Sequence, residues 1–316
     1  MSNGLAKLLV WLAGQLPYER VKEVLEKVGH LHVTTSQVWR CTQVEGERLR
    51  RVAECGRSEG RAVPGASQRL GCSVDGGMIH IRGEGWKELK IGDVFEVTMR
   101  AEADRRTGEA IEQGRAVRDS YVAHLGGPER FGKLLWQEAA RRGWNRATET
   151  LVVADGAAWI WNLVKTHLYD SQQVVDWYHA LQHLAAAGQL LLGDHPQEFR
   201  AWLTKWSTRL YQGQAKQIAH MLQREARRLP SHAEALRNEA GYFLNNHRRM
   251  QYMQMREQGW PIGSGMVESG CKQFKHRFAG PGMRWSRSGA ERLIPIRAAI
   301  MSSHFDDLWR SSLPPN

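Results

Sequence analysis

The first 55 residues carry apolar side chains at helical spacing. Leucines recur every three or four positions over 5–12, and a second apolar stripe covers 21–28. Both patterns predict amphipathic helices. Gly29 is expected to end the second helix, and Thr34 is a candidate N-cap for a third. The Gly-, Arg- and Ser-rich stretch at 56–69 then indicates a linker.

The periodicity changes at residue 70, where β-branched or alternating segments are separated by turn signals. The segments CSVDGG, MIHIR and DVFEVTMR, all between residues 72 and 100, predict three antiparallel strands. Residues 121–125 form either a weaker fourth strand or the end of a helix.

A strand–helix–strand pattern follows a predicted helix at 129–142. The short apolar runs TLVVAD and QQVVD predict buried strands on either side of a helix at 158–167. Antiparallel strands followed by such a unit are typical of a mixed α/β layer.

No strand signal recurs between residues 178 and 261, where apolar positions keep helical spacing. We therefore expect an α/β fold in three parts. A helical segment and linker at 1–69 precede a core formed by 70–177 and 262–312, and an all-helical insertion at 178–261 interrupts that core.

Composition points to a polyanionic partner. The 316 residues include 44 Lys and Arg against 33 Asp and Glu, a net charge of +11, which favours nucleic acid. A membrane is not expected, because no apolar stretch approaches the ~20 residues of a spanning helix. The start of the chain lacks the pattern of a signal peptide, and the four cysteines form no CxxC pair. These features predict a cytoplasmic protein, associated with the nucleoid when bound to DNA.

Three aspartates terminate predicted strands. Asp75, Asp155 and Asp176 follow SV, VVA and VV respectively, and carboxylates at strand ends lie where α/β sheets gather ligands. An Asp-Gly step is also a common turn, so each aspartate alone is as readily a turn former.

Glu268 is the candidate for a further metal-binding acid. It follows a Gly-Ser-Gly turn at the start of a predicted helix, with Lys272 and Lys275 on the same face. An acid beside lysines suits a cation held next to phosphates. The alternative is a Glu–Lys pair on a solvated helix.

Asp176, His179 and His183 share one helical face and allow three interpretations. They are neighbours of the active site, or Asp176 caps the helix, or the three residues bind zinc.

Basic residues around Glu268 are candidates for DNA contacts, with Trp285 as a stacking platform for bases. The region 18–53 resembles a helix-turn-helix in which Gln37 and Arg40 begin the recognition helix, although plain helical packing gives the same pattern. The predicted DNA-binding residues are Arg40, Lys272, Lys275, Arg277, Arg284, Trp285 and Arg287.

Four segments resemble bacterial insertion-sequence transposases with a DDE catalytic domain, in the group related to Mutator-like elements. They are SVDGG (73–77), VVADGAAWIWN (152–162), VVDWYHALQHL (174–184) and GSGMVESGCKQFKHRFAGPGMRWS (263–286). The resemblance extends from about residue 5 to 305. Relatives often carry a cysteine-bearing zinc ribbon upstream, whose cysteines are absent from this sequence.

The resemblance implies an RNase H-like core with a helical insertion before the last acid. It assigns Asp75, Asp155 and Glu268 as catalytic, metal-binding acids for Mg²⁺, with Mn²⁺ substituting, and places Asp176 and His179 in an Asp-x-x-His motif beside them. The expected activity is cleavage at transposon ends and strand transfer into target double-stranded DNA by a homodimer or larger assembly. A structure-specific RNase H-like nuclease and a non-catalytic DNA-binding relic are the alternatives.

Overall fold

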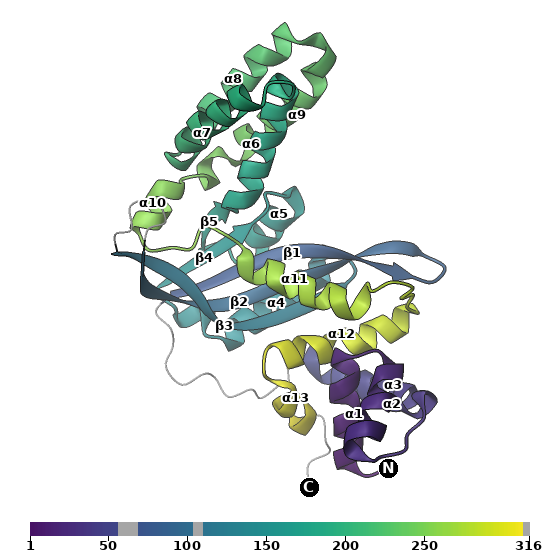
Figure 1. Cartoon of the computed structure of the whole chain (residues 1–316). Helices are drawn as coiled ribbons and strands as arrows, with labels where there is room; N and C mark the ends of the chain where they lie inside the picture. Colours follow the sequence, from purple (N-terminus) through teal and green to yellow (C-terminus); the bar gives the residue numbers. More distant parts are fainter. Residues whose placement is uncertain (56–68, 104–109, 312–316) are drawn as a thin grey trace.

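Five strands form one mixed sheet at the centre of the computed structural model, which describes residues 1–55, 69–103 and 110–311 (Figure 1). The strands are β1 (Arg69–Ile81), β2 (Gly85–Ala103), β3 (Ala110–Leu125), β4 (Glu149–Ala154) and β5 (Gln172–Val175). Their order is β3-β2-β1-β4-β5. The first three pair antiparallel, whereas β4 and β5 run parallel to β1. The predicted RNase H-like α/β class is confirmed.

The first two predicted strands are one. SVDGG and MIHIR both lie in β1, which passes through Gly76 and Gly77 without turning because these glycines pair with Lys90 and Leu89 of β2. The turn falls at 82–84 instead. The third antiparallel strand is β3, which settles the open assignment of 121–125 as strand.

Alternation along β1 divides the core into two. Cys72 and Val74 pack in one cluster with residues of α4 (Pro128–Arg141) and α5 (Ala158–His167). Ile79 and Ile81 pack in the other with residues of α11 (Gly265–Phe278). Because side chains alternate across a strand, Asp75 lies on the α11 side.

The predicted helical segments are observed before, within and after the core. The N-terminal helices are α1 (Asn3–Gln15), α2 (Tyr18–Gly29) and α3 (Thr35–Glu54). Between β5 and α11 lie α6 (Trp177–Leu192), α7 (Pro196–Tyr211), α8 (Ala215–Arg228), α9 (Ala233–Asn246) and α10 (Tyr252–Glu257). Figure 1 shows α6 to α9 as an arm extending away from the sheet. The C-terminal helices are α12 (Arg287–Met301) and α13 (Phe305–Ser311).

Most of the predicted linker, residues 56–68, lies outside the described residues. Within the described ranges, no helix is both long and apolar enough to cross a bilayer.

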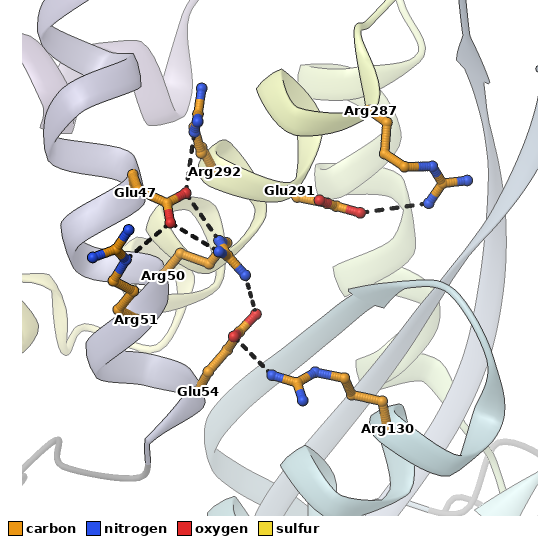
Figure 2. A network of polar contacts seen from close by, with 8 residues as sticks. All are labelled: Glu47, Arg50, Arg51, Glu54, Arg130, Arg287, Glu291 and Arg292. Atoms are coloured by element: carbon orange, nitrogen blue, oxygen red, sulfur yellow. Dashed lines mark hydrogen bonds and ion pairs between the residues drawn. The ribbon is translucent and has the colours of Figure 1, made fainter. Parts of the chain in front are cut away.

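Ion pairs attach α3 to the core (Figure 2). Glu47 accepts hydrogen bonds from Arg50 and Arg51 of its own helix and from Arg292 of α12. Glu54 pairs with Arg130 of α4 at 2.7 Å. Glu47 is therefore the point at which three guanidinium groups meet between the N-terminal helices and the C-terminal part of the chain.

Stability should depend on pH through Glu47. The hydrogen bond from Arg50, with those from Arg292 and Arg51, lowers the pKa of Glu47 from 4.5 to about 2. Its stabilisation is therefore complete above the pKa of the unfolded chain and is lost as pH falls toward 2. Glu47→Gln should destabilise the protein by up to about 1 kcal/mol at pH 7, since solvent screens such pairs, with the difference disappearing between pH 4.5 and 2.

Urea denaturation of both proteins across this pH range measures the effect. The matched control is Glu45→Gln, because Glu45 pairs with Arg48 on its own helix. A Glu47→Gln difference that persists unchanged at pH 2 would contradict the assignment.

Candidate functional site

Strand register brings three aspartates into one row. Val74 of β1 is level with Ala154 of β4, which is level with Val175 of β5. Asp75, Asp155 and Asp176 each follow one of these positions. Because the three strands are parallel, the aspartates lie side by side at the level where β4 and β5 end and β1 continues. Asp75 is inside β1, which corrects its predicted position at the end of a strand.

Asp75 and Asp155 are half-buried neighbours. One oxygen of Asp75 accepts a hydrogen bond from the Gly76 N–H at 2.6 Å, and one oxygen of Asp155 accepts from the Ala157 N–H at 2.8 Å. Burial raises the pKa of Asp155 and the nearby Asp75 raises it further, whereas the Ala157 N–H and His179 act in the opposite direction. A cation between the two carboxylates would relieve this unfavourable charge.

Asp176 connects α6 to the start of α11. It is fully buried, and its two oxygens accept hydrogen bonds from the N–H groups of His179, at 2.8 Å, and Ser264. The N–H of Trp177 donates to the carbonyl oxygen of Ile262 at 2.9 Å. The capping interpretation of Asp176 is confirmed, and the same side chain fixes the turn that precedes Glu268.

Glu268, which follows the insertion in sequence, lies close to Asp176 and His179. Asp176, His179 and Glu268 each offer a ligand atom, and these atoms lie within 4.8 Å of one another. Asp176 already accepts hydrogen bonds from two backbone N–H groups, so Glu268 and His179 are the members of this trio that are freer to bind a cation. His183, the third residue of the zinc interpretation, is not in the trio, and its Nδ1 lies 2.7 Å from Glu239 Oε2 instead.

Cys271 lies between Glu268 and Asp75 in its electrostatic surroundings. This buried thiol lies one helical turn after Glu268, and the charges of both acids act on it. Burial, followed by the charge of Asp75, raises the pKa of Cys271 well above its ordinary value, so the thiol stays protonated. Sequence reasoning missed Cys271, although its i+3 spacing from Glu268 placed it on the same helical face.

Four of the predicted DNA-binding residues are exposed: Arg40, Lys272, Lys275 and Arg284. The stem of Lys275 lies over Gly77, where its Cε is 3.2 Å from the position of a Cβ. Arg287, also predicted to contact DNA, is paired with Glu84 and Glu291.

The predicted DNA contacts of Arg277 and Trp285 differ from what the structure shows. Arg277 is 1% exposed, donates from Nε to the Ala13 carbonyl oxygen at 2.8 Å, and lies over the ring of Tyr18. Trp285 packs against Tyr18 and Phe278, and its indole N–H donates to the Phe278 carbonyl oxygen. Both side chains join the N-terminal helices to the core. Arg277 is therefore not presented to DNA, whereas Trp285 is half-buried and its ring is partly occupied by these contacts.

A hollow of about 680 Å³ lies elsewhere, between β3, α3, α4 and α12. Neither Glu268 nor any of the three aspartates lines it, and its charged residues include the ion pairs Glu54–Arg130 and Glu138–Arg141. The candidate site is therefore not this hollow but the group of Asp75, Asp155, Asp176 and Glu268, called the acid cluster below.

Comparison with known proteins gives a local similarity. No protein-family model matches the chain. Over 73 residues it is 29% identical to the UPF0236 protein in the vanSb 3′ region of Streptococcus gallolyticus, a match that covers 23% of this chain and 16% of that protein. The match thus spans about a sixth of the relative's length, and the relative's name states no activity. The chain is similar to part of a UPF0236 protein.

Proposed function

We propose that the protein is a divalent-metal-dependent DNA transposase. The observation that carries this proposal is the gathering of acids from distant segments on an RNase H-like sheet. Strand register aligns Asp75, Asp155 and Asp176, and ligand atoms of Glu268 and Asp176 lie within 4.8 Å of one another. The resemblance of four sequence segments to insertion-sequence transposases supports it, and the local similarity to a UPF0236 protein is compatible with it.

The donor set fits hard divalent cations. Carboxylate oxygens are the ligands that Mg²⁺ and Mn²⁺ prefer, and a histidine nitrogen is tolerated by Mn²⁺. Asp75, Asp155 and Glu268 would hold the ions, with His179 beside them. Bound ions of this kind supply charge stabilisation for phosphoryl transfer. The raised pKa of Asp155 is consistent with a site that gains by taking up positive charge.

The surrounding side chains suit a DNA backbone. Lys272 and Lys275 are exposed on the helix that carries Glu268, and Arg284 is exposed beyond it. Such contacts neutralise phosphates and position DNA without reading its sequence. Buried Asp176 keeps this helix next to the sheet, so that phosphates held by its lysines lie close to the acids. Transposition joins two element ends, so we expect at least a homodimer on DNA.

A strand-transfer assay tests the proposal. The DNA flanking the gene supplies candidate terminal repeats, which are offered as labelled duplexes with a supercoiled target and Mg²⁺ or Mn²⁺. We expect cleavage at the repeat end and joining to the target, both abolished by EDTA. Cleavage without joining would instead indicate a structure-specific nuclease. Binding without cleavage in either metal would indicate a non-catalytic relic.

A further inference from the structure

The helical insertion touches the acid cluster through Tyr242 of α9. Its hydroxyl donates to the main-chain carbonyl oxygen of Asp155 at 3.0 Å. The next residue, Gly156, has a φ of +102°, and a Cβ there would lie 2.9 Å from a ring carbon of Tyr242. Ring and hydroxyl together therefore hold the turn that carries Asp155, and only glycine fits beneath the ring.

Two charged or polar partners brace Tyr242. The ring of His183, on α6, stacks on the phenol ring with centroids 3.6 Å apart and an interplanar angle of 20°. His183 Nδ1 lies 2.7 Å from Glu239 Oε2, and Glu239 is one turn before Tyr242 on α9. The insertion thus contributes a phenol, an imidazole and a carboxylate that fix one another.

The same turn orients the Asp155 carboxylate. One of its oxygens accepts the Ala157 N–H at 2.8 Å, so any rotation of the Asp155–Ala157 backbone redirects the side chain.

We infer that Tyr242 is a positioning residue: it fixes the turn at Asp155 and so directs the Asp155 carboxylate toward Asp75. The His183–Glu239 pair in turn holds Tyr242 in place. The insertion therefore helps to orient one acid of the cluster, Asp155, from outside the sheet. The catalytic consequence rests on the proposed function, whereas the effect on the Asp155–Ala157 turn does not.

Tyr242→Phe tests the effect on the turn and the effect on catalysis separately, because it keeps the stacked ring and removes only the hydroxyl donor. Hydrogen–deuterium exchange in the full-length protein should be faster in the peptide that covers residues 154–160. The cleavage rate at saturating DNA should fall about tenfold or more, as for a misplaced catalytic group, with DNA affinity unchanged. The matched control is Tyr211→Phe, since Tyr211 lies in the same insertion and its ring packs on Trp177.

Each outcome is decisive. Unchanged exchange at 154–160 in Tyr242→Phe overturns the positioning role, whether or not the protein cleaves DNA. Faster exchange together with wild-type cleavage overturns its catalytic consequence. Faster exchange in a protein whose wild type lacks metal-dependent cleavage leaves the positioning intact and refutes the proposed function.

A double-mutant cycle tests the brace. If Glu239 acts through Tyr242, Glu239→Ala should also accelerate exchange at 154–160, and combining it with Tyr242→Phe should give less than the sum of the two effects. Glu239→Gln should retain more of the wild-type behaviour, because its amide can still hydrogen-bond His183. Strictly additive effects would show that the pair does not act through Tyr242.

Discussion

Asp155→Asn is expected to abolish DNA cleavage while the protein stays folded and binds DNA. The amide keeps the shape of the side chain but removes the negative charge that would hold a cation, and the loss of several kcal/mol of charge stabilisation corresponds to roughly 10³-fold or more in rate. Burial and Asp75 already disfavour the Asp155 charge, so fold stability should be equal or higher. Asp75→Asn should behave in the same way.

Cleavage rate, DNA affinity and the urea midpoint of each variant are measured together. DNA affinity should be unchanged or tighter, because a negative charge facing phosphates is removed. Asp170→Asn is the matched control, since Asp170 is an exposed aspartate in the turn before β5. Full cleavage by a well-folded Asp155→Asn protein would refute the metal site.

Asp176→Ala is expected to lose stability as well as cleavage. The substitution removes the cap of α6, which costs roughly 0.5–2 kcal/mol, and leaves the buried Ser264 N–H without its acceptor, which costs about 1–3 kcal/mol more. The start of α11 is then no longer fixed, so Glu268 should be displaced and cleavage should fall with stability.

His179→Ala supplies the contrast. Its backbone N–H still donates to Asp176, so the cap remains, and we expect a near-native urea midpoint with cleavage reduced by orders of magnitude. Equal stability of Asp176→Ala and wild type would contradict the connecting role of Asp176. Normal joining by His179→Ala would remove His179 from the active site.

Local patterns predicted most elements of the core, and they failed where tertiary pairing overrode a turn signal. Asp-Gly-Gly is a strong turn sequence, yet β1 continues through it because β2 offers a complete row of partners. Glycine at position 77 allows α11 to pack on β1, because its missing side chain makes room for the stem of Lys275. No window of sequence around residue 77 contains that information.

In the candidate site, too, some residues could be predicted from local sequence and others could not. Asp75, Asp155 and Asp176 were detectable because each follows a recognisable apolar strand, and parallel pairing then aligned them. Tyr242 and Glu239 had no comparable signal, because their i,i+3 spacing is that of any helical face. Charge alone was a poor guide in the case of Arg277, which binds a carbonyl oxygen of α1 in the interior.

The position of α11 has a consequence for protein synthesis. Glu268 lies 92 residues after Asp176 (268 minus 176), so the ribosome releases the whole strand edge, followed by the helical arm, before the last acid emerges. Contacts between segments so distant in sequence form late in folding. A nascent chain that can already build its sheet therefore lacks Glu268, and under the proposed chemistry DNA near the translating ribosome is not cut before α11 has emerged.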